Sequence, residues 1–158
     1  MSQVHLSVAV KGNKASIKVC GRATFECCED LKKFCNRMLE EGKSPLIFEM
    51  KDCKGMDSTF MGTLTQFSLS AMKKKAVIEM RNIGAENKKN LESIGLIKMF
   101  TFTETEEDGS FEELEKSEVT QDQHQENVLS AHEVLIDVHE PNRAEFQDIV
   151  KFLKESPE

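Results

Sequence analysis

The residues best placed to do chemistry form a short hydroxyl cluster, Asp57-Ser58-Thr59, inside the stretch DCKGMDSTFMGTL. The cluster lies where a buried strand is expected to end and a helix to begin. A helix N-terminus presents unpaired backbone N–H groups and the positive end of the helix dipole, so it stabilises an anion. A phosphate on Ser58 is compatible with this position. Capping of the helix by the Ser58 hydroxyl is the simpler alternative.

Other reactive patterns are missing. The sequence has no G-x-x-x-x-G-K-[ST], no G-x-S-x-G and no H-E-x-x-H, and it nominates no base that would activate Ser58 as a nucleophile. His132 and His139 are seven residues apart and would lie near one face of a helix, but no third metal ligand is evident. We therefore expect no enzyme, no metal site and no cofactor.

Composition indicates a cytoplasmic protein. The 158 residues are 39% hydrophobic and 31% charged, and no apolar run approaches the roughly 18 residues of a membrane helix. The start, MSQVHLSVAV, shows no signal-peptide pattern, and five cysteines without framework spacing suit a reducing compartment. The net charge of -7 is uneven: residues 1–103 hold 17 basic and 11 acidic side chains, and residues 104–158 hold 4 and 17. This acidic tail argues against nucleic acid as a partner.

The elements that must position the hydroxyl cluster follow from hydrophobic periodicity. Alternating segments predict strands, and Gly12-Asn13 between the first two predicts a hairpin turn. Segments of helical spacing separate the later strands, which indicates an α/β fold: a mixed sheet of about four to five strands, largely parallel behind an initial antiparallel hairpin. The expected strands are 4–10, 15–21, 45–50, 76–82 and 99–103, and the expected helices are 24–42, 60–71 and 86–95.

The C-terminal third is expected to be separate from this domain. Its composition predicts an acidic linker over 105–126 and a helical extension over 127–158, after a domain that ends near residue 104. Two apolar stripes run along the extension: Val128, Ala131, Val134, Leu135 and Val138, then Phe146, Ile149, Val150 and Leu153. Helices this short are marginal alone, so the stripes need a surface, either on their own domain or on a second copy in a homodimer.

The element order and one motif resemble a known family. Met56-Asp57-Ser58-Thr59-Phe60-Met61-Gly62 reads as D-S-[ST]-x-x-G, follows LIFEMKDC, and precedes an IGL before the last expected strand. Over roughly residues 3–103 the chain resembles a STAS domain, the fold of bacterial anti-sigma factor antagonists. The resemblance implies a regulatory protein without chemistry of its own that binds an anti-sigma factor, often a serine kinase of histidine-kinase-like fold. That kinase phosphorylates the antagonist, a phosphatase restores it, and the bare form binds well. The matching serine is Ser58, with Thr59 as the alternative.

The resemblance also implies a binding face around this motif. It would comprise Arg22, Asp57, Ser58, Thr59, Phe60, Met61 and Thr65, with Met72 farther along the exposed side of the helix. The turn Gly21-Arg22-Ala23-Thr24 lacks the acid that family members commonly carry there, and Phe60 is expected to enlarge the apolar surface. Two alternatives stay open. The C-terminal helices could build a scaffold without phosphorylation, or the acidic tail could fold over the binding face and compete with a partner.

Overall fold

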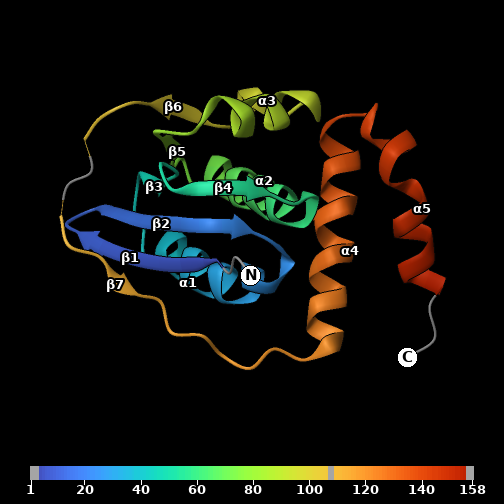
Figure 1. Ribbon diagram of the computed structural model, residues 1–158, viewed down its shortest axis with the longest axis horizontal. Coiled ribbons are helices and arrows are strands. Elements are labelled where there is room, and N and C mark those ends of the chain that lie inside the picture. Colours follow the sequence, from blue (N-terminus) through green and yellow to red (C-terminus); the bar gives the residue numbers. More distant parts are fainter. Residues whose placement is uncertain (1–3, 107–108, 156–158) are drawn as a thin grey trace.

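A computed structural model describes residues 4–106 and 109–155, in which helices pack against one mixed sheet (Figure 1). Within these residues, no helix is both long and apolar enough to cross a membrane. The elements follow in the order β1 (His5–Lys11), β2 (Lys14–Ala23), the 3-10 turn η1 (Phe25–Cys27), α1 (Cys28–Glu40), β3 (Leu46–Glu49), β4 (Cys53–Met56), α2 (Ser58–Lys73), β5 (Ile78–Arg81), α3 (Ala85–Ser93), the 3-10 turn η2 (Ile97–Met99), β6 (Thr101–Thr103), β7 (Glu112–Glu113), α4 (Gln121–Val138) and α5 (Asn142–Glu155).

The sheet has the predicted mixed character. Its path is β6-β5-β3-β2-β1-β7, with β4 paired to the end of β2. β1 and β2 form the antiparallel hairpin, whose turn places Gly12 at a φ of 58°, while β2, β3, β5 and β6 are parallel neighbours. The described residues form seven strands rather than four to five, because β4 and β7 are additional. The expected α/β fold is confirmed.

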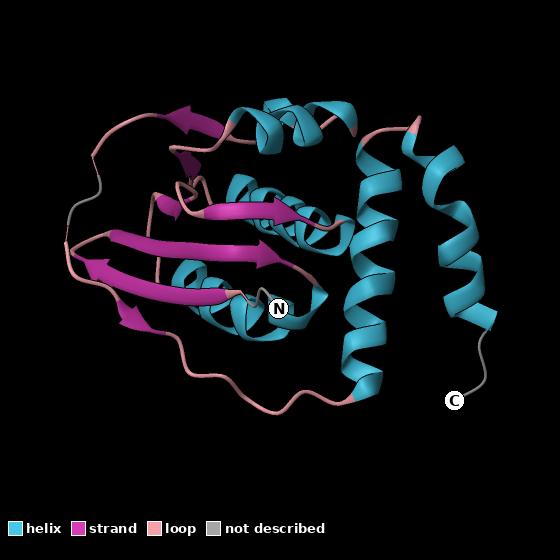
Figure 2. Ribbon diagram, in the orientation of Figure 1, coloured by secondary structure: helices cyan, strands magenta, loops and turns pink. Residues whose placement is uncertain are grey.

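The core lies between this sheet and two helices, α1 and α2, which lie together behind the sheet in the view of Figure 2. All four residues of β3 are buried, as expected for a strand covered on both faces. Phe48 of β3 stacks on Phe67 of α2 with ring centroids 6.2 Å apart. Cys28 and Cys35 of α1 are completely buried and act as small apolar residues in this core.

The C-terminal third is more ordered than the sequence predicted. Two residues of the expected linker form β7 on the edge of β1, and α4 begins at Gln121, where the Thr120 and Gln123 side chains form a reciprocal capping box. α4 lies across the end of the sheet toward which β2 and β4 point, and α5 lies on the far side of α4 (Figure 1). The stripe containing Ala131 and Leu135 is therefore covered by the chain's own domain.

Candidate functional site

The hydroxyl cluster lies at the start of α2, directly after β4. Asp57 is the residue that caps this helix: its Oδ1 accepts a hydrogen bond from the Phe60 N–H at 2.8 Å. Its Oδ2 accepts from the Phe25 N–H at 2.9 Å, which fixes the η1 turn against the start of α2. The alternative in which Ser58 caps the helix is therefore wrong, because Ser58 is the first helical residue and its hydroxyl bonds elsewhere.

The Ser58 hydroxyl bonds a histidine from the C-terminal third of the chain. Its Oγ lies 2.7 Å from Nε2 of His132, and Nδ1 of His132 lies 2.6 Å from the carbonyl oxygen of Val128. A carbonyl oxygen accepts only, so Nδ1 donates to Val128. With a single ring proton, Nε2 then accepts from the Ser58 hydroxyl. Ser58 is half-buried and His132 is 3% exposed. The hydroxyl is thus neither open to solvent nor sealed in the core, but covered by α4.

A close helix crossing lies one turn beyond Ser58. A methyl group placed on Gly62 would lie 2.5 Å from the carbonyl oxygen of Ala131 and 2.7 Å from its Cβ. The glycine of the D-S-T-x-x-G motif therefore lets the backbone of α4 approach α2 closely. Ala131 is completely buried at this contact.

The structure separates the predicted binding residues into two groups. Arg22 is exposed on β2, where it pairs in register with Gly55 of β4. Met72 is 66% exposed near the end of α2. Apart from Asp57 and Ser58, the other four candidates are buried: Thr59 is 4% exposed, Phe60 0%, Met61 7% and Thr65 0%.

Two expectations are corrected by this burial. Phe60 belongs to the core and adds nothing to the surface, because its position three residues after the cap turns it toward the sheet. The side of α2 that carries Met61 and Thr65 is not exposed in this conformation, since α4 packs against the helix. Thr59, the alternative phosphorylation site, is also out of reach of solvent.

Sequence reasoning missed two asparagines that join the C-terminal helices to the domain. Asn127 accepts a hydrogen bond from Lys32 Nζ at 2.9 Å and donates one to Glu29 Oε1 at 3.1 Å, both on α1. Asn142 donates through Nδ2 to the carbonyl oxygens of Ile94 at 2.9 Å and Leu135 at 2.8 Å. Both asparagines are nearly fully buried, at 2% and 3% exposure.

The sequence does contain a signal for the contact of Asn127, which is the position of this polar residue on the helix. Asn127 precedes Ala131 by four residues and therefore shares its helix face, so a polar residue stands at the start of the apolar stripe. The seven-residue spacing relates His132 to His139 as potential metal ligands but does not indicate the contact of His132 with Ser58. No group of three potential ligands that could hold a metal ion occurs in the part of the chain that the structure describes.

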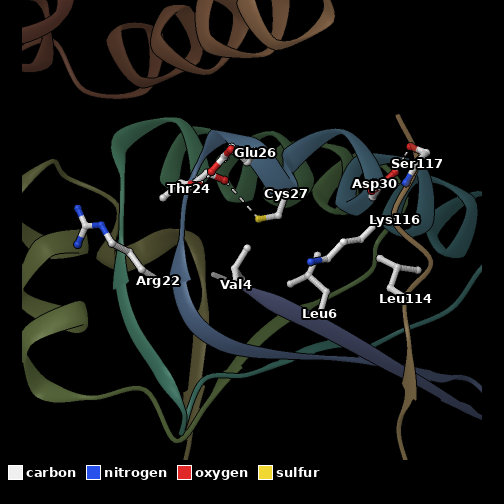
Figure 3. A pocket seen from close by; sticks show the side chains of 10 residues that line it. All are labelled: Val4, Leu6, Arg22, Thr24, Glu26, Cys27, Asp30, Leu114, Lys116 and Ser117. Carbon is white, nitrogen blue, oxygen red and sulfur yellow. Dashed lines mark hydrogen bonds between the residues drawn. The ribbon is translucent and has the colours of Figure 1, made fainter. Parts of the chain in front are cut away.

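A cavity of about 240 Å³ lies near this site but does not include Ser58 (Figure 3). It is lined by residues of β1, β2, the η1 turn, α1 and the segment 114–117. This segment is held by hydrogen bonds from the Ser117 backbone N–H and hydroxyl to Asp30. Cys27 points into it, while the Arg22 side chain extends away from the other lining residues. The pKa of Cys27 is raised, most strongly by a hydrogen bond with the Cys28 thiol and next by burial. The Cys27 thiol is therefore a poor nucleophile.

The comparisons with known proteins agree with the architecture. The family model for the STAS domain matches residues 7–109. A solved structure from Thermotoga maritima, described as a candidate anti-sigma factor antagonist, superposes with a TM-score of 0.55 and 14% sequence identity, covering 62% of this chain and 85% of that chain. A likeness at this identity shows the fold alone. None of the curated proteins compared with the chain matches it. Helices α4 and α5 lie outside the matched residues.

Proposed function

Because this chain belongs to the STAS domain family, we propose that it is a regulatory protein whose binding to a protein partner is switched by phosphorylation at Ser58. The proposed partner is an anti-sigma factor that is also a serine kinase of histidine-kinase-like fold, opposed by a phosphatase. The protein itself carries no catalytic activity in this scheme.

The observation that carries the proposal is that Asp57, and not Ser58, caps α2. Asp57 caps α2, so the Ser58 hydroxyl is not needed to satisfy the helix N-terminus. Ser58 nevertheless stays in the first turn, where the backbone N–H groups and the helix dipole favour a negative group. A phosphate there adds a charge of about -1.5 to -2.

The same charge would weaken a complex formed over this face. A partner that packs against the start of α2 would remove the phosphate from water, and unpaired charges at an interface are unfavourable. A penalty of about 3 kcal/mol lowers affinity by roughly a hundredfold.

The test uses protein and extract from the cells that make this chain. Phosphopeptide analysis of the purified protein should find phosphate on Ser58. Capture of the anti-sigma kinase by wild type and Ser58→Ala should be strong, and capture by Ser58→Asp should be weak. Ser93→Asp is the matched control, because Ser93 is exposed on α3 and should not alter capture. Equal recovery by all four proteins would rule out the switch.

A second candidate function is assembly through α5. Phe152 is 69% exposed and Ile149, which belongs to the second apolar stripe, is 38% exposed. The two residues are three positions apart on α5 and share a face that the chain's own domain does not cover. Light scattering over a range of protein concentrations should then show a dimer that Phe152→Ser dissociates. A monomer at every concentration would exclude this function.

A further inference from the structure

We propose that α4 and α5 (residues 121–155, the C-terminal cap) form a displaceable cover over the Ser58 face of α2. The cap must move off before Ser58 is phosphorylated or a partner docks there. The need for the cap to move before phosphorylation or docking rests on the proposed function, whereas the displaceable cover does not. The two helices of the cap, which lie outside the family domain, would thus compete with a partner for the binding face within the same molecule.

The first support is steric. Nε2 of His132 lies at hydrogen-bond distance from Ser58 Oγ, so the direction from which a phosphoryl group would arrive is occupied by the imidazole. The Gly62–Ala131 crossing leaves no space for α4 to approach α2 more closely. A phosphoryl group on Ser58 Oγ would need the space that the imidazole ring of His132 fills. The closed cap and the phosphorylated serine are therefore incompatible in this arrangement.

The second support is the polar character of the attachment. The cap is joined to the domain by three buried polar contacts: Asn127 with α1, His132 with Ser58, and Asn142 with the Ile94 carbonyl. When the cap leaves, these groups regain hydrogen bonds to water, so opening costs less than separating an apolar interface of the same size. The buried apolar residues of the cap are Ala131, Leu135, Ile136 and Phe146. The attachment therefore favours closure while leaving opening accessible.

The third support is that most residues of the buried core belong to the domain, while the cap contributes Leu135, Ile136 and Phe146 to it. The stacked Phe48 and Phe67 lie between the sheet and α2, and the family match ends at residue 109. The cap can thus open as a unit, in the manner of the local unfolding that hydrogen exchange detects. Opposite net charges assist closure, since residues 121–155 hold 3 basic and 8 acidic side chains and residues 1–103 hold 17 and 11.

The experiment measures amide hydrogen exchange on the full chain. Ala131→Gln places a long side chain against Gly62 from the cap side and leaves every residue of the domain unchanged. Asp137→Gln puts the same residue at an exposed position of the same helix and serves as the control. In wild type, α4 amides should exchange through an opening that leaves β3 protected. In Ala131→Gln, protection of α4 should fall by roughly a hundredfold with β3 unchanged, and Asp137→Gln should match wild type.

Two outcomes would overturn the cover. One is unchanged protection of α4 in Ala131→Gln. The other is an equal loss of protection in β3, which would make the cap part of the cooperative core.

A second measurement separates the cover from the proposed function. Phosphorylation of Ser58 by the purified anti-sigma kinase with ATP should be at least about tenfold faster in Ala131→Gln than in Asp137→Gln. Equal rates would show that the cap does not control access to Ser58. An opened cap with no phosphorylation in either variant would support the cover and refute the phosphorylation switch.

Discussion

Replacing Gly62 with alanine sets two effects of opposite sign against each other. In a helix interior, alanine is about 1 kcal/mol more favourable than glycine, so the change should stabilise α2 if nothing packs on it. In the closed chain, the new methyl group would lie 2.5 Å from the backbone oxygen of Ala131, and backbone cannot rotate away as a side chain can. Overpacking of this kind costs about 1–3 kcal/mol, and displacement of α4 also weakens the Ser58–His132 hydrogen bond, worth about 1 kcal/mol.

The net expectation is a loss of about 1–3 kcal/mol in the free energy of unfolding. Urea denaturation followed by circular dichroism measures this quantity. Gly84→Ala is the matched control, because Gly84 is exposed at the start of α3 and a Cβ there meets no atom within 4 Å. Gly84 is the N-cap of α3, where alanine is a poorer cap than glycine, so the control should lose less than about 1 kcal/mol. If Gly62→Ala instead raises stability by about 1 kcal/mol, α4 is not seated on α2 and the reasoning fails.

Three further perturbations test individual contacts. Ser58→Ala should lower the free energy of unfolding by about 1–2 kcal/mol in a urea titration, because it leaves Nε2 of His132 buried without a donor. Asn142→Ala removes two hydrogen bonds and should cost about 2–3 kcal/mol by the same assay; Asn142→Asp should not restore the loss, since a carboxylate cannot donate to two carbonyls. Burial raises the pKa values of Cys35 and Cys53 above the ordinary 9.0, so the folded state holds their protons longer than the unfolded state. Their contribution to stability is therefore present below about pH 9 and lost as the pH rises, and the urea midpoint should fall from pH 8 to pH 10, less steeply in Cys35→Ala.

The elements that the sequence predicted are those with long apolar patterns. The hairpin of β1 and β2 and the amphipathic α1 each bury one face, so their periodicity is strong. β4 was missed because its four residues, CKGM, include an exposed lysine and a glycine. β7 was missed because its two residues are both glutamate, and its pairing with β1 depends on the edge of the finished sheet.

The sequence predicted the features of the candidate site that depend on neighbouring residues, but not its long-range contacts. Asp57 and Ser58 are both good capping residues, and their order alone does not say which one caps; the contact of Asp57 with Phe25, 32 positions earlier, decides it. The burial of Ser58 under His132 joins residues 74 positions apart. Such a contact depends on how α4 docks, which hydrophobic periodicity does not specify.

The short strand β7 also sets how strongly any outside molecule must bind in order to replace α4. Once Glu112 and Glu113 are fixed to β1, residues 114–120 alone separate that anchor from the first turn of the helix, and Ser117 is held on Asp30 as well. A segment tethered this closely meets its docking surface at an effective concentration in the millimolar range. A free competitor present at micromolar concentration would need an intrinsic affinity about a thousandfold higher than that of the tethered helix. The affinity that a competitor needs in order to displace α4 therefore depends on the length of the segment 114–120 as much as on the contacts between α4 and the domain.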